Sequence, residues 1–123
     1  MAIYTRGKRR ARKPTKEDRL SLVFGALADP TRRAMLERLR GVELSVTELA
    51  KPFGMSQPTI SKHLKVLENA GLVVQGRDAQ WRPRALRTAP LEEVDAYLER
   101  FRKLWDEQFD RLDVYLEELK RER

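Results

Sequence analysis

Polar side chains gather in one short stretch of the chain, between positions 56 and 65. Hydroxyl, amide, imidazole and ammonium groups follow one another there, on Ser56, Gln57, Thr59, Ser61, Lys62, His63 and Lys65. Groups of these kinds match the hydrogen-bond donors and acceptors that base pairs display in the major groove of DNA. Apolar residues recur between them at helical spacing, at Ile60, Leu64 and Leu67. The pattern predicts a helix with an anchored apolar face and a polar face turned toward a ligand.

Position along this helix separates the expected roles. We assign base reading to Gln57, Thr59 and Lys62. We assign phosphate contact to Ser56, Ser61 and Lys65, because the N-terminus of a helix also offers backbone N–H groups to an anion. Two alternatives stay open, since Ser56 serves at least as well as a simple N-cap and His63 can hydrogen-bond inside the protein as readily as it can touch DNA.

Arginines outside the helix extend this set of candidates. The segment from Gly76 to Arg87 is rich in bases that can straddle a phosphate backbone or enter the narrow minor groove. The residues expected to contact DNA from this segment are Arg77, Gln80, Arg82 and Arg84. Arg32, with its neighbour Arg33, either holds phosphate or pairs with acids of the C-terminal region.

Catalytic chemistry finds little support in the sequence. The chain has no cysteine and a single histidine, and it has no glycine-rich phosphate loop. A thiolate nucleophile and a cysteine-ligated zinc are therefore excluded. Its acids gather on the C-terminal region rather than around one cleft. We expect no enzyme activity, no cofactor and no metal site.

The elements that must position these residues form a mainly helical domain. Apolar periodicity, with start signals at Pro30, Ser45 and Ser56, predicts helices over 17–28, 30–40, 46–51 and 57–69. The third and fourth, joined by about four residues that include Gly54, make a helix-turn-helix. Residues 72–74 and 81–87 predict the two strands of a hairpin. The expected fold class is mainly α with a small β-hairpin, a winged helix-turn-helix.

One long helix is expected from Pro90 to the end of the chain. Apolar residues step by three or four from Leu91 to Leu119, over roughly 43 Å at 1.5 Å per residue. So small a domain cannot cover that stripe, and pairing with a second copy is the simplest explanation. The alternative is a helix that wraps its own domain. The expected dimer interface consists of Leu20, Phe24, Leu91, Val94, Leu98, Phe101, Trp105, Phe109, Leu112 and Leu116.

Charge is unevenly distributed along the 123 residues, whose net charge is +7. Residues 1–16 hold seven bases and no acid, and we expect them to be a disordered basic arm before a single domain over 17–123. Residues 31–87 hold 11 bases and 5 acids, whereas residues 88–123 hold 7 bases and 11 acids. The excess of bases in residues 1–16 and 31–87 favours binding to nucleic acid. Because no apolar stretch resembles a signal peptide or a membrane span, a cytoplasmic location is expected.

The motifs together resemble the ArsR-type (ArsR/SmtB) winged-helix repressors. The resemblance rests on "LADPTRRAMLERL", "ELSVTELA", "MSQPTISKHLKVLENAGLV" and "GRDAQWRP", and it covers roughly residues 18–118. It implies a homodimer built from the first and last helices, which binds double-stranded DNA at an operator with imperfect two-fold symmetry. The expected function is therefore sequence-specific transcriptional regulation, as a repressor.

The metal sensors of that family are missing from this sequence. Members that sense arsenite or cadmium use a Cys-x-Cys type pair in the third helix, and the aligned positions here are Ser45 and Thr47. Other members bind zinc or nickel through His and carboxylates of the last helix, which here has no His. A small-molecule effector is not identified. The alternative function is a protein-interaction adaptor that keeps a winged helix and works through its long helix.

Overall fold

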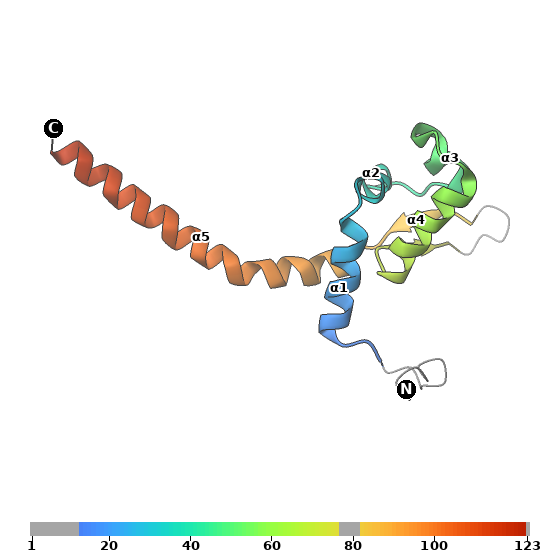
Figure 1. The fold of residues 1–123 in the computed structure, drawn as a ribbon, viewed down its shortest axis with the longest axis horizontal. Coiled ribbons are helices and arrows are strands. Elements are labelled where there is room, and N and C mark those ends of the chain that lie inside the picture. The colour runs from blue at the N-terminus through green and yellow to red at the C-terminus, as the bar shows by residue number, and fades with distance from the viewer. Residues whose placement is uncertain (1–12, 77–81, 123) are drawn as a thin grey trace, which may run out of the picture.

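The computed structural model describes residues 13–76 and 82–122, and it is a winged helix-turn-helix with a long C-terminal helix (Figure 1). The predicted fold class is confirmed. The elements in chain order are α1 (Lys16–Leu27), α2 (Pro30–Arg38), α3 (Val46–Ala50), the 3-10 helix η2 (Lys51–Phe53), α4 (Gln57–Asn69), β1 (Val73–Gln75), β2 (Arg84–Leu86) and α5 (Ala89–Arg121).

Side-chain caps mark where α1, α2, α3 and α4 begin. Ser45 and Glu48 form the predicted capping box at α3, and the hydroxyl of Ser56 accepts from the backbone N–H of Thr59 at α4. Asp29 caps α2, a role that the sequence analysis did not assign. Each cap satisfies a backbone N–H that has no partner within its helix. The predicted bounds of α4 are confirmed.

The second predicted helix is two residues too long. It ends at Arg38, and Leu39 closes it with a tight hydrogen bond from its N–H to the carbonyl oxygen of Leu36. Gly41 follows in the left-handed region, at φ +72°, which turns the chain toward α3. Glycine reaches that conformation without steric cost, so the chain leaves the helix before position 40.

The core lies between the first four helices and the inner face of the hairpin. It is built from the apolar faces of α1, α2 and α4 with Leu49 of α3, and from the residues that lead into β1. The fully buried large side chains are Val23, Met35, Leu39, Leu49, Ile60, Leu67, Leu72 and Val73. Ile60, Leu64 and Leu67 are therefore the anchored face that the sequence predicted for α4.

The hairpin is short, and a third segment of the chain pairs with its second strand. β1 and β2 pair antiparallel, with Val73 opposite Leu86 and Gln75 opposite Arg84. Leu44, just before α3, exchanges two backbone hydrogen bonds with Arg84, at 3.0 and 2.7 Å. The loop before the helix-turn-helix is thus fastened to the wing, a long-range contact that the sequence did not indicate. The predicted tip of the wing, at 77–81, lies outside the described residues.

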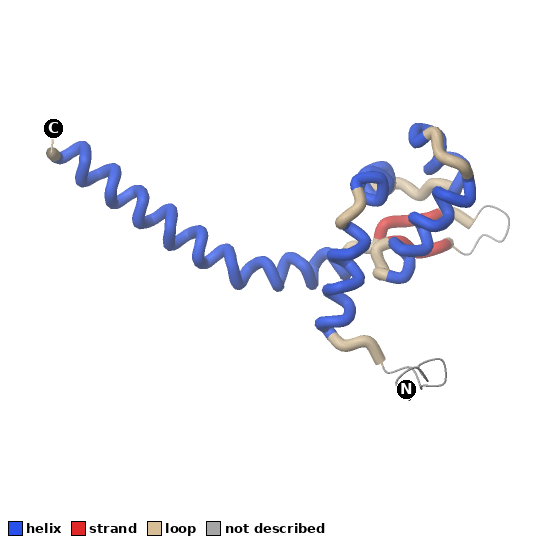
Figure 2. The backbone as a smooth tube through the Cα atoms, viewed as in Figure 1, coloured by secondary structure: helices blue, strands red, loops and turns tan. Residues whose placement is uncertain are grey.

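Helix α5 leaves the domain and projects away from it (Figures 1 and 2). Its 33 residues span about 49 Å. Its first turns pack on α1, where Pro90 and Val94 are buried, and every residue from Leu98 to Glu122 is exposed. The alternative of a helix wrapped around its own domain is therefore wrong. Among the described residues, no helix is long and apolar enough to cross a membrane.

Candidate nucleic-acid interface

The helix-turn-helix presents one face of α4 to solvent. Helix α3 runs directly into η2, which contains Pro52, and Gly54, with φ +61°, supplies the left-handed turn before α4 begins. Because Ile60, Leu64 and Leu67 are buried, the opposite face of α4 must be exposed. The exposed residues in and just before α4 include Ser56, Gln57, Thr59, Ser61, Lys62 and Lys65. The structure therefore leaves exposed six of the seven residues that the sequence singled out in this segment.

Ser56 and Thr59 share their hydrogen bonds at the first turn of α4. The two hydroxyl oxygens lie 2.9 Å apart, and the backbone N–H of Thr59 donates to the Ser56 hydroxyl at 3.3 Å. Ser56 is thus an N-cap, as one of the two alternatives held. Gln57 and Lys62 have no such internal role among the described contacts, and their side chains are free to reach a ligand.

His63 faces into the protein rather than out from it. Its side chain is 18% exposed, and its Nδ1 lies 3.4 Å from Nη1 of Arg32 and 3.9 Å from Oδ2 of Asp29. In the tautomer that carries its proton on Nε2, Nδ1 accepts from Nη1 of the arginine. The structure thus favours the intramolecular alternative for His63, which ties α4 to the junction of α1 and α2.

Arg32 holds that junction together. Its Nε donates to the carbonyl oxygen of Ala26 at 2.8 Å, and its Nη2 donates to that of Gly25 at 3.0 Å. Its backbone N–H donates to the carboxylate of Asp29, and this bond, with the guanidinium charge, lowers the pKa of that carboxyl. Arg33 similarly donates to the carbonyl oxygen of Leu27. Of the two alternatives for Arg32 and Arg33, pairing with acids of the last helix is wrong, because their side chains donate to carbonyl oxygens at the C-terminus of α1 instead.

Arg32→Ala is expected to lower the free energy of unfolding by about 1.5–3 kcal/mol, because it removes hydrogen bonds from a charged donor to two carbonyl groups. Urea denaturation measures this change. Lys62→Ala is the matched control, since Lys62 is exposed on α4, and we expect it to lower DNA affinity at unchanged stability. An Arg32→Ala variant that kept full stability and lost only salt-dependent DNA affinity would identify Arg32 as a phosphate contact.

The arginine side chains of the wing differ in their exposure to solvent. Arg84 is 14% exposed, its Nε donates to Oε2 of Glu68 at 2.9 Å, and its Nη1 donates to the carbonyl oxygen of Arg82. Arg84 therefore fastens the wing to α4, which corrects the expectation that its side chain faces DNA. Arg82 is exposed and has a positive φ of 43°. Arg77 and Gln80 lie outside the described residues.

The residues expected at the dimer interface fall into two groups. Leu20 and Val94 are 4% and 9% exposed and belong to the core of their own domain, which leaves them little surface for a partner. Leu91 is half-buried against that core. The exposed group is Phe24, Leu98, Phe101, Trp105, Phe109, Leu112 and Leu116. Tyr97, which the sequence analysis missed, joins Phe24 to Phe101 through two edge-to-face ring contacts, at centroid distances of 5.8 and 5.4 Å. The only signal for Tyr97 was its spacing of four residues from Phe101 on the same helix.

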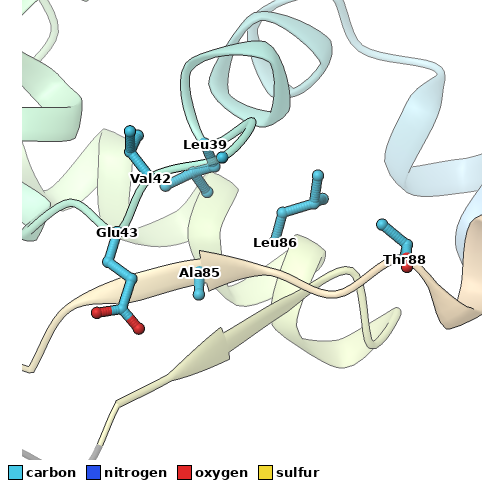
Figure 3. A pocket seen from close by; sticks show the side chains of 7 residues that line it. Leu39, Val42, Glu43, Ala85, Leu86 and Thr88 are labelled. Atoms are coloured by element: carbon cyan, nitrogen blue, oxygen red, sulfur yellow. The ribbon is translucent and has the colours of Figure 1, made fainter.

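A shallow hollow lies between the chain that follows α2 and strand β2 (Figure 3). Its lining is mostly apolar, from Leu39, Val42, Ala85 and Leu86, with Glu43 at its edge. Glu43 is the one ionisable side chain in this lining, so the hollow offers no acid–base pair. Among residues 13–76 and 82–122, no group of three or more His, Cys, Asp or Glu side chains is placed to hold a metal ion.

Comparison with known proteins matches the part of the chain that contains this surface. A family model described as a helix-turn-helix domain matches residues 27–75. The chain is 37% identical over 71 residues to the transcriptional repressor SdpR of Bacillus subtilis (strain 168), across 58% of this chain and 79% of that protein. It is 42% identical over 78 residues to the arsenic resistance transcriptional regulator ArsR1 of Pseudomonas putida, across 63% of this chain and 61% of that one. The match thus spans less than two thirds of ArsR1.

The fold is also found among solved structures. A crystal structure of an ArsR family transcriptional regulator superposes with a TM-score of 0.66 at 41% sequence identity. The superposition covers 72% of this chain and 97% of the other. The chain therefore shares both sequence and fold with a solved member of this family.

Proposed function

The chain belongs to the ArsR family of winged-helix transcriptional regulators, and from this premise we propose that it is a homodimeric repressor of transcription that reads a two-fold related operator. Proteins of the family bind DNA through the helix-turn-helix and are regulators rather than enzymes. A repressor of this kind occupies DNA by sequence, so its affinity depends on side chains that reach base edges.

The exposed face of α4 is the observation that carries this proposal. Gln57, in the first turn of α4, and Lys62 are both exposed on a helix that Ile60, Leu64 and Leu67 anchor in the core. A glutamine amide matches adenine through two hydrogen bonds and a lysine ammonium matches guanine acceptors, both in the major groove. The backbone N–H groups of the first turn favour a phosphate beside them. We assign base reading to Gln57, Thr59 and Lys62, and phosphate contact to Ser61 and Lys65.

Gln57→Ala is expected to weaken operator binding by about 1–3 kcal/mol and to relax base preference at one position in each half-site. Selection of binding sites from random duplexes measures the preference, and footprinting should show half-sites about 10–10.5 base pairs apart. Arg40→Ala is the control, because Arg40 is exposed but pairs with Glu37 outside the helix-turn-helix. An unchanged preference at every position in the Gln57→Ala variant would remove Gln57 from the reading set.

A protein-interaction adaptor remains the second candidate, and the exposed apolar stripe of α5 is the observation that favours it. The two functions separate in one assay. Electrophoretic mobility shifts with excess competitor DNA leave a sequence-specific complex intact for a repressor, whereas an adaptor would form no complex that resists competition.

A further inference from the structure

Arg84 lies where the wing, helix α4 and the loop before α3 meet. Its backbone exchanges two hydrogen bonds with Leu44, and its Nε donates to Oε2 of Glu68 on α4 at 2.9 Å. Its Nη1 donates to the carbonyl oxygen of Arg82 at 2.6 Å, and its side chain is only 14% exposed. Because a planar guanidinium binds several acceptors in one fixed geometry, Arg84 holds these segments in place relative to one another.

Arg82, which Arg84 holds within the wing, has a strained backbone. Its φ of 43° is left-handed, and it precedes Pro83, although a proline favours extended backbone in the residue before it. Such a conformation persists only where surrounding contacts hold it. The bond from Arg84 is one such contact. Gly76 supplies another, since its N–H donates to the carbonyl oxygen of Pro83 at 2.7 Å, and a Cβ at position 76 would lie 2.8 Å from Cγ of that proline.

The side chain of Arg82 is exposed, and it makes no hydrogen bond or ion pair with another described residue. We propose that this guanidinium contacts a DNA phosphate, and that Arg84 is a positioning residue that holds Arg82 at a fixed place relative to α4. The inference rests on the proposed function and adds how the wing and α4 bind one operator together. A backbone that is ordered in advance loses less conformational freedom on binding, so more of the attraction to phosphate appears as affinity.

The link through Glu68 joins this phosphate contact to base reading. Glu68 belongs to the same helix as Gln57 and Lys62, so the position of the wing is set against the helix that enters the major groove. Phosphate contacts position a protein on the duplex, whereas contacts to base edges specify the sequence. Loss of the link should therefore lower operator affinity and its salt dependence without changing which bases are preferred.

A double-mutant cycle between Arg82→Ala and Arg84→Gln tests the inference on operator DNA. Each neutralised phosphate contributes about −0.9 to the slope of log affinity against log salt, so loss of the contact from both protomers should flatten the slope by about 2. We expect this flattening in each single variant and no further flattening in the double variant. The base preference at the position read by Gln57 should stay unchanged. Arg19→Gln is the matched control and should keep the wild-type slope, because Arg19 likewise donates to a glutamate, Glu93, and to a backbone carbonyl oxygen, but outside the wing.

Arg84→Lys separates position from charge. A lysine keeps the positive charge, but its single ammonium group cannot reproduce the planar fork that joins Glu68 to the carbonyl oxygen of Arg82. We therefore expect Arg84→Lys to flatten the slope as Arg84→Gln does, although its net charge equals that of the wild type. This variant also keeps the inference testable if Arg84→Gln fails to fold.

Amide hydrogen exchange tests the positioning without DNA. The N–H groups of Leu44 and Gly76 donate to the carbonyl oxygens of Arg84 and Pro83, so their exchange reports local opening of the loop and the hairpin. In Arg84→Gln and Arg84→Lys both should exchange about tenfold faster or more, because hydrogen bonds from a charged donor are lost. The N–H of Leu72, which bonds to the last turn of α4, distinguishes local opening from unfolding of the whole domain, and its rate should rise less.

Four results would overturn the inference. Additive flattening in the double variant would mean that Arg84 contacts DNA itself, and a wild-type slope in both Arg84 variants would mean that it positions no DNA contact. Unchanged exchange at Leu44 and Gly76 would show that Arg84 does not hold the wing. In these three cases the wild type still binds its operator, so the proposed function would stand. A wild type that forms no sequence-specific complex would remove the proposed function, and the phosphate contact of Arg82 with it.

Discussion

Leu98→Asp should dissociate the dimer, with the largest effect that we expect from a single substitution. Burying a large apolar side chain contributes roughly 1.5–3 kcal/mol, and each dimer contains the residue twice. The dissociation constant of the dimer should therefore rise about 100-fold or more, since every 1.4 kcal/mol is a factor of ten. Leu98 is 42% exposed in the single chain, so the fold of the protomer should persist. Light scattering at micromolar concentration measures the change, and circular dichroism checks the fold.

Val114→Asp is the matched control for that experiment. Val114 is on the same helix and is 58% exposed, but it lies nine residues from Trp105 and so faces away from the stripe. A loss of mass in both variants would show that charge on α5, rather than the stripe, governs association. A wild-type protein that is already monomeric would contradict the homodimer. Operator affinity should fall with the dimer, because a single protomer reads only one half-site.

Local signals explain what could be predicted from the sequence. The caps at Ser45 and Ser56 were predictable, because each side chain bonds to a backbone N–H only three residues away. The two faces of α4 followed from the spacing of Ile60, Leu64 and Leu67, which is a property of the helix alone. The exposed stripe of α5 was predictable in the same way, because its apolar periodicity extends over more residues than so small a domain can bury.

Contacts between distant segments explain what could not be predicted. Arg84 meets Glu68 of α4, and its backbone pairs with Leu44, because the hairpin folds back over the helix-turn-helix. Arg32 and His63 are 31 positions apart, and only the packing of α2 on α4 joins them. The spacing of residues along the chain does not predict which distant side chains will meet. Arg32 and Arg84 were therefore expected to contact DNA on the basis of their charge alone. The core positions of Leu20 and Val94 depend likewise on how α1 crosses α5.

Removal of the basic arm is expected to have the second large effect, which is on the salt dependence of DNA binding. Residues 1–12 lie outside the described part of the chain, so this prediction rests on charge. Seven bases within residues 6–16, without an acid, can follow phosphates but present no fixed pattern to bases. Each neutralised phosphate contributes about −0.9 to the slope of log affinity against log salt. If each of the two arms reaches two or three phosphates, removing them should flatten the slope by about 4–5 units.

A variant that begins at Thr15 tests the arm without disturbing the domain. Thr15 is the N-cap of α1 and forms a capping box with Asp18, so the helix keeps its start signal. A full-length variant with Arg6, Lys8, Arg9, Arg10, Arg12 and Lys13 replaced by glutamine separates the loss of charge from the loss of length. Both variants should lose affinity for operator and for random duplex to the same degree across a salt series. Identical slopes in wild type and variants would leave the arm without a role in DNA binding, whereas a loss confined to the operator would mean that the arm reads sequence.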